Sequence, residues 1–184
     1  MKKALLVVDL VNSFRPGWEL PVGGMDDIIE PINRLMASGD YDVIVVVGEW
    51  HPHDHCSFAR WGRHGEAGTP GAEFHPDLNL RFASMILRKG MDGDVDCTSA
   101  FASHVDAKGV RRETGLDGYF RAIGVTDVDC CGVALEVCVT DSGMDSASRG
   151  YRTRVLRSLT RSIDQANDAD TIAKLRATGV NVVA

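Results

Sequence analysis

The stretch Ala4-Leu5-Leu6-Val7-Val8-Asp9 places five apolar residues in a row and ends on an acid. The stretch Val43-Ile44-Val45-Val46-Val47 repeats this pattern and leads through Gly48 to Glu49. Continuous apolar runs are typical of strands that are buried on both faces, as in a parallel sheet between two layers of helices. These two stretches therefore predict the central strands of an α/β fold.

Further short apolar runs alternate with helical patterns along the chain. The predicted strands are 4–8, 43–47, 85–87, 125–131, 155–156 and 180–183, and the predicted helices are 26–37, 115–122, 135–148 and 167–177. This alternation predicts a three-layer α/β fold whose mostly parallel central sheet of about six strands is flanked by helices. We find no internal repeat, and we expect residues 1–184 to form a single domain.

Composition narrows the classes of function. The chain has 184 residues, is 44% hydrophobic and carries a net charge of -6. An acidic surface without a basic run argues against nucleic-acid binding, and no apolar run is long enough to span a membrane. Five cysteines, an odd number without a paired framework, favour a reducing compartment and a cytoplasmic protein.

Five of the six histidines lie between His51 and His75. Histidine is the commonest neutral metal ligand, and Glu49 precedes this cluster by two residues. Glu49, His51, His53 and His55 alternate, so an extended chain would point their side chains the same way. The alternative is a polar loop of exposed histidines, but their density at a strand end favours a site for one divalent metal ion.

Acidic, basic and thiol side chains follow the predicted strands. Asp9, Glu49 and Lys89 end the first three strands, and Cys138 lies in the first turns of the helix after the fourth. Parallel sheets bind ligands at the carboxyl ends of their strands. Asp9 could take the proton of a Cys138 nucleophile while Lys89 balances the charge, and a helix N-terminus would lower the pKa of the thiol. The alternatives are a simple ion pair and a buried core cysteine.

Several segments resemble the nicotinamidases, within the isochorismatase-like cysteine hydrolase superfamily. They are Val7–Phe14, Trp50–Pro52, Asp54–Ala59, Gly68–Pro76, Lys89–Gly90 and Gly132–Val139. The resemblance implies a metal-dependent amidohydrolase of NAD salvage that converts nicotinamide to nicotinate and ammonia through a cysteine thioester. Pyrazinamide is an expected second substrate, and the implied metal is zinc, with iron or manganese as alternatives. A homo-oligomer is left open.

The resemblance also implies roles for individual residues. It implies a catalytic triad of Asp9, Lys89 and Cys138, and metal ligands at Glu49, His51, His55 and His64. It implies that the aromatic residues Phe14 and Trp61 flank the substrate. It also implies that the backbone amides of Ala134 and Cys138 bind the oxyanion, next to a cis Val133–Ala134 bond. The sequence departs from the usual family pattern at Val11, Ser13 and Glu49.

Two other functions fit the same residues. One is a related cysteine hydrolase that acts on another small amide or ureido compound, although relatives of that type generally lack the histidine cluster. The other is a non-catalytic metal-binding module that keeps the fold. Amide hydrolysis with and without a chelator separates these functions from hydrolysis of nicotinamide.

Overall fold

Six strands form one parallel sheet in the computed structural model, which describes residues 1–184. The strands are β1 (Lys2–Val8), β2 (Val43–Glu49), β3 (Met85–Lys89), β4 (Val125–Val133), β5 (Arg152–Arg161) and β6 (Asn181–Val183). Their order across the sheet is β3-β2-β1-β4-β5-β6, and every neighbouring pair is parallel. The predicted α/β class with a parallel sheet of six strands is confirmed.

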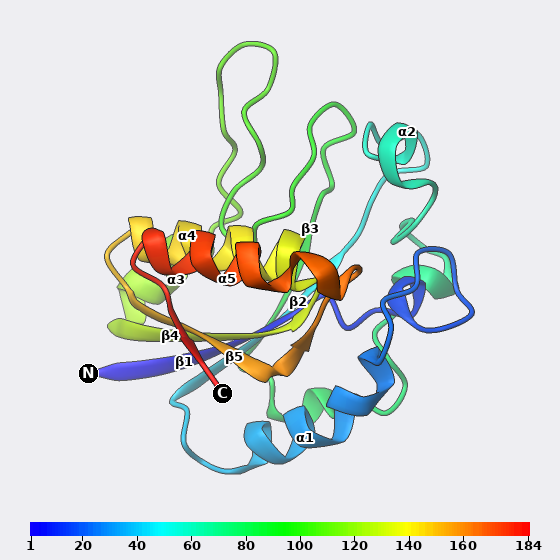
Figure 1. Ribbon diagram of the computed structural model, residues 1–184. Helices are drawn as coiled ribbons and strands as arrows, with labels where there is room; N and C mark the ends of the chain where they lie inside the picture. Colours follow the sequence, from blue (N-terminus) through cyan, green and yellow to red (C-terminus); the bar gives the residue numbers. More distant parts are fainter.

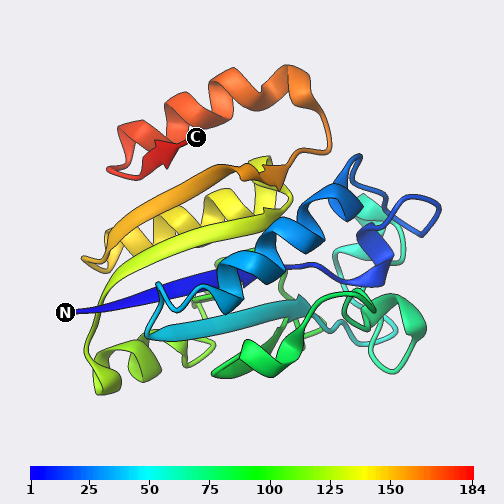
Figure 2. The ribbon, with the colours of Figure 1, turned by 90° about the horizontal axis from the view of Figure 1, so that it is seen from below.

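Helices cover both faces of the sheet (Figure 1). Helix α1 (Met25–Ala37) lies on one face, and α3 (Leu116–Ile123), α4 (Thr140–Ser148) and α5 (Asp168–Ala177) lie on the other. Figure 2, seen from below, shows α1 crossing in front of the strands. No helix is both long and apolar enough to cross a membrane.

Alternation along β1 builds the two hydrophobic layers. Ala4, Leu6 and Val8 pack in the layer under α3 and α5, whereas Leu5 and Val7 pack in the layer under α1. All five side chains are fully buried. Both faces of the strand therefore need apolar residues, which explains the unbroken apolar run in the sequence.

The order of the strands in the sheet determines where the site lies. From β1 the chain passes through α1 to β2 on one side, whereas β4 lies on the other side of β1. Parallel sheets bind ligands at such a switch in strand order. The close approach of β4 to β1 there requires glycine, because Gly132 has a φ of 110° and a Cβ on it would lie 2.8 Å from the Val8 nitrogen.

Three elements differ from the prediction. The helix predicted over 135–148 begins with a π-helical turn, Leu135–Val139, before α4. Strand β5 extends well beyond the predicted 155–156, because many of its side chains are only partly buried and leave no apolar run. A short helix, α2 (Phe58–Trp61), forms in the connection between β2 and β3.

Asp129, in the middle of β4, joins this strand to its neighbours through side-chain contacts. Its buried carboxylate accepts two hydrogen bonds from Arg154, at 2.7 and 2.6 Å, and one from the Tyr41 hydroxyl at 2.6 Å. The Lys3 ammonium lies 3.1 Å away. Burial would raise the pKa of Asp129, but these bonds outweigh burial and lower it.

We predict that Asp129→Asn lowers the free energy of unfolding at pH 7 by about 2 kcal/mol, the scale of hydrogen bonds to a charged group. Because folding depresses the pKa of Asp129 below 3.8, its contribution is present above the unfolded-state pKa and is lost as the pH falls through the folded pKa. Urea unfolding at pH 7 and at pH 3 measures both effects, and the two proteins should differ less at pH 3.

Asp127→Asn is the matched control, because Asp127 lies on the same strand and also accepts two bonds from an arginine, Arg152. That pair is more exposed, so its loss should change stability by only about 0–1 kcal/mol. Equal losses in the two variants would contradict the role of Asp129.

Candidate active site

Four chemically active side chains meet at the carboxyl edge of the sheet. Asp9 follows β1, Glu49 ends β2, Lys89 ends β3, and Cys138 lies in the π-helical turn that follows β4. Each is no more than 4% exposed. The structure therefore brings together the three residues of the predicted triad and adds the carboxylate of Glu49.

The Lys89 ammonium lies at the centre of this group. Its Nζ is 3.0 Å from Asp9 Oδ2 and 3.2 Å from Glu49 Oε1. It also donates to the carbonyl oxygen of Cys97 at 3.0 Å and lies 3.6 Å from Cys138 Sγ. One buried cation thus contacts two carboxylates, a carbonyl oxygen and the thiol.

Asp9 combines an unusual backbone conformation with a shifted pKa. Its φ of 53° is the only positive value among the non-glycine residues, and such conformations are concentrated at functional sites. Burial raises the pKa of Asp9 to about 6, with Lys89 opposing the shift and Glu49 adding to it. A carboxyl group with this pKa can both accept and release a proton near neutral pH.

The thiol of Cys138 does not have the lowered pKa that its place near a helix N-terminus predicted. Burial raises its pKa well above the usual value, and the charge of Lys89 offsets this only in part because Asp9 and Glu49 add to the rise. The prediction was wrong because it omitted burial beside two carboxylates. The resting thiol therefore keeps its proton, and Cys138 Sγ and a carboxylate oxygen of Asp9 belong to one group of atoms within 4.8 Å of one another.

The second oxygen of Glu49 faces two histidines. Glu49 Oε2 lies 3.3 Å from Nε2 of both His51 and His64. The other ring nitrogens, Nδ1, lie 2.9 Å from the Gly90 oxygen and 2.7 Å from the Gly62 oxygen. Because a carbonyl oxygen only accepts, each Nδ1 carries the hydrogen, and in the neutral rings both Nε2 atoms present lone pairs to the carboxylate.

This arrangement fits a divalent metal ion. Two imidazole lone pairs and a carboxylate oxygen converge, and Glu49 Oε2 and His51 Nε2 are buried without a hydrogen-bond partner. Burial would raise the pKa of Glu49, but Lys89, His51 and His64 lower it, so the carboxylate is charged. Histidine nitrogen and carboxylate oxygen are the donors that zinc prefers, and the bonds from Nδ1 fix the ligand orientation.

His55, the fourth predicted ligand, lies beside this group and outside it. Its ring stacks on His51 with 4.0 Å between the ring centroids, and its Nδ1 lies 2.7 Å from the Ser57 hydroxyl. Its Nε2 is buried without a partner. His53, which alternates with these residues in the sequence, is exposed and takes no part in the cluster.

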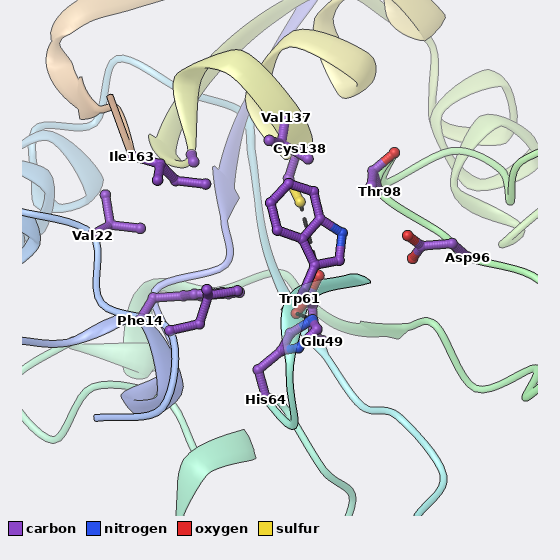
Figure 3. A pocket seen from close by; sticks show the side chains of 12 residues that line it. Phe14, Val22, Glu49, Trp61, His64, Asp96, Thr98, Val137, Cys138 and Ile163 are labelled. Atoms are coloured by element: carbon purple, nitrogen blue, oxygen red, sulfur yellow. Dashed lines mark hydrogen bonds and ion pairs between the residues drawn. The ribbon is translucent and has the colours of Figure 1, made fainter. Parts of the chain in front are cut away.

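The predicted substrate-flanking residues Phe14 and Trp61 line one hollow of about 390 Å³ that also contains Cys138 (Figure 3). Its other walls are mostly apolar, with Glu49 and His64 among the few polar residues, and Glu49 Oε1 lies 3.9 Å from Cys138 Sγ (dashed line in Figure 3). Ala134 lines the same hollow, and the Val133–Ala134 bond is cis, as the resemblance implied. A flat ring between the aromatic side chains would lie beside both the thiol of Cys138 and the metal-type cluster, which consists of Glu49, His51 and His64.

Sequence reasoning missed three contributors, which all follow Lys89. Asp96 and Thr98 line the hollow, and the carbonyl oxygen of Cys97 accepts the bond from Lys89. This segment has no regular secondary structure and no distinctive motif. Its position directly after the carboxyl end of β3 was the available signal, because such connections line the sites of parallel sheets.

Comparisons with known proteins cover nearly the whole chain. The sequence profile of the isochorismatase domain matches residues 3–184. The nicotinamidase of Acinetobacter baylyi is 36% identical over 181 residues, which cover 88% of this chain and 82% of that protein. The structure of PnC1 from L. infantum in complex with nicotinate has a TM-score of 0.92 at 32% identity, covering 99% of this chain and 92% of that one. Pyrazinamidase of Pyrococcus horikoshii in complex with zinc has a TM-score of 0.86 at 31% identity, covering 100% and 99%.

We predict that Glu49→Gln weakens binding of Zn²⁺ by about 10–100-fold or more, because it removes the negative charge that faces both histidines. Competition with a chromophoric chelator measures the affinity in the absence of any substrate. Glu73→Gln is the control, because Glu73 is exposed on a neighbouring loop. An unchanged affinity in Glu49→Gln would exclude Glu49 as a ligand.

Proposed function

The chain belongs to the isochorismatase-domain family, and from that premise we propose that it hydrolyses nicotinamide to nicotinate and ammonia. The observation that carries the proposal is a buried thiol, a carboxyl group with a raised pKa and a Glu–His–His cluster around one apolar hollow. The relatives named nicotinamidase and pyrazinamidase, at more than 30% identity, support it. Pyrazinamide, which has the same carboxamide on a similar ring, is a second substrate.

The first half of the reaction forms a thioester. Asp9 takes the proton of Cys138, and the sulfur attacks the amide carbon while the carbon–oxygen π electrons move to the oxygen. Backbone amides of Ala134 and Cys138 hold this oxyanion. Asp9 gives its proton to the amide nitrogen, the carbon–nitrogen bond breaks, and ammonia leaves.

The second half returns the thiol. Asp9 takes a proton from water, and the resulting hydroxide attacks the thioester carbon. The carbon–sulfur bond then breaks and the sulfur regains the proton from Asp9. Nicotinic acid leaves and gives its own proton to water, which yields nicotinate. Lys89 keeps its charge throughout, since its pKa is raised well above the usual value by its carboxylate and thiol neighbours despite burial. It therefore offsets the negative charge that moves between Asp9 and Cys138.

Glu49, His51 and His64, together with His55 through its unpartnered Nε2, would hold a divalent ion, zinc before iron or manganese, and that ion would supply a Lewis acid for the ring nitrogen of the substrate. The aromatic faces of Phe14 and Trp61 hold the ring by stacking. Five free cysteines support a cytoplasmic location.

We predict hydrolysis of nicotinamide and pyrazinamide with release of ammonia, and much slower hydrolysis of benzamide, which lacks the ring nitrogen. A chelator should reduce the first two rates, and added Zn²⁺ should restore them. Cys138→Ala is the control for non-enzymatic release. If benzamide were hydrolysed as fast as nicotinamide, the metal would have no part in recognising the ring. No activity on any of the three amides would contradict the proposed function.

A further inference from the structure

The peptide of Gly65 joins the residues of the metal-type cluster. It follows His64 directly, and its carbonyl oxygen accepts a hydrogen bond from the backbone of His51 at 2.8 Å. A Cβ on Gly65 would lie 2.9 Å from Glu49 Cβ, so this peptide packs against the third member of the cluster. A shift of Gly65 would therefore change the positions of all three donors relative to one another.

Ser13 holds the other side of this peptide. Its hydroxyl oxygen accepts the hydrogen bond from the Gly65 nitrogen at 2.9 Å, across 52 positions of sequence. Ser13 is fully buried, and a Cβ on Gly71 would lie 2.6 Å from its hydroxyl oxygen. The loop that carries His64 is thus tied through this one oxygen to the segment after β1.

The same serine is bonded to the wall of the substrate hollow. It lies in the turn Asn12–Phe14, and its carbonyl oxygen accepts from the backbone of Leu20 at 2.9 Å. Phe14 in turn accepts from the backbone of Val22 at 2.9 Å. Phe14, Leu20 and Val22 all line the hollow. Ser13 therefore lies between the apolar wall and the histidine cluster.

We propose that Ser13 is a positioning residue that sets the affinity of the metal site by fixing the Gly65 peptide, and so couples the Phe14 side of the hollow to His64. The inference rests on the metal-dependent part of the proposed function. Without the hydroxyl, the buried Gly65 N–H loses its acceptor, and a buried N–H without a partner is unfavourable enough to move its loop or admit water. Either change displaces His64 from Glu49 and His51.

The chain offers a matched control in Asn12, the neighbour of Ser13 in the same turn. Its side-chain amide donates to the Pro70 oxygen at 2.9 Å, so it ties the same turn to the same connection. It makes this bond away from Gly65 and the histidines. Asn12→Ala and Ser13→Ala each remove one bond between these two segments, and only Ser13→Ala removes the acceptor of Gly65.

The experiment measures Zn²⁺ affinity of the metal-free full chain by competition with a chromophoric chelator, with hydrogen exchange at the Gly65 amide as a second readout. We expect Ser13→Ala to weaken Zn²⁺ binding by about 10–100-fold, as found when a group that orients a ligand is removed, and to speed exchange at Gly65. Asn12→Ala should leave both unchanged. Ser13→Thr keeps the oxygen, and its affinity should lie closer to that of the unsubstituted chain.

Equal Zn²⁺ affinity in Ser13→Ala and Asn12→Ala, even with a lower melting temperature in both, would overturn the inference and leave Ser13 a packing residue. Affinity in Ser13→Thr as weak as in Ser13→Ala would also overturn it, because the oxygen would not be the cause. Ammonia release from nicotinamide is scored separately. A chain that binds Zn²⁺ but releases none would refute the proposed function and leave this inference standing, whereas a chain that binds no Zn²⁺ would overturn the inference.

Discussion

The buried ammonium group of Lys89 is the constraint on which the site depends. An isolated charge in a protein interior is strongly unfavourable, and Lys89 is tolerated because Asp9 and Glu49 surround it at 3.0 and 3.2 Å and a carbonyl oxygen takes another of its hydrogens. The dependence is mutual, since two carboxylates buried this close together require a cation between them. Glu49 and Lys89 end two adjacent strands and Asp9 directly follows the third, so the register of β1, β2 and β3 fixes the electrostatics of the site.

Glu49 connects the two halves of the site. One of its oxygens contacts Lys89 and the other faces His51 and His64, so one carboxylate belongs both to the thiol group and to the metal-type cluster. A glutamate side chain has more rotamer freedom than an aspartate side chain. Partners on both oxygens and an exposed fraction of only 4% remove most of that freedom. The charge that a metal ion brings would therefore be felt at Lys89 through a single rigid side chain.

Much of this arrangement was predictable from the sequence, because it follows from strand ends. Apolar runs located β1, β2 and β4, and the parallel sheet then placed Asp9, Glu49 and Cys138 at one edge. The raised pKa of Cys138 was not predictable from its place near a helix terminus, since it depends on burial beside Asp9 and Glu49. The hydrogen bond from Lys89 to the Cys97 oxygen and the bond from Gly65 to Ser13 were also not predictable from the sequence. Each joins a side chain to a backbone group of a loop, and a backbone group leaves no residue pattern in the sequence.

We propose that this cluster makes Cys138 the nucleophile that carries the acyl group of nicotinamide. Rapid acid quenching during turnover, followed by peptide mass mapping, tests it most directly. We expect a nicotinoyl thioester on the peptide that contains Cys138, which appears with substrate, disappears when substrate is exhausted and is absent from Cys138→Ala. Turnover without that adduct, or an adduct carried by the exposed Cys56, would contradict it.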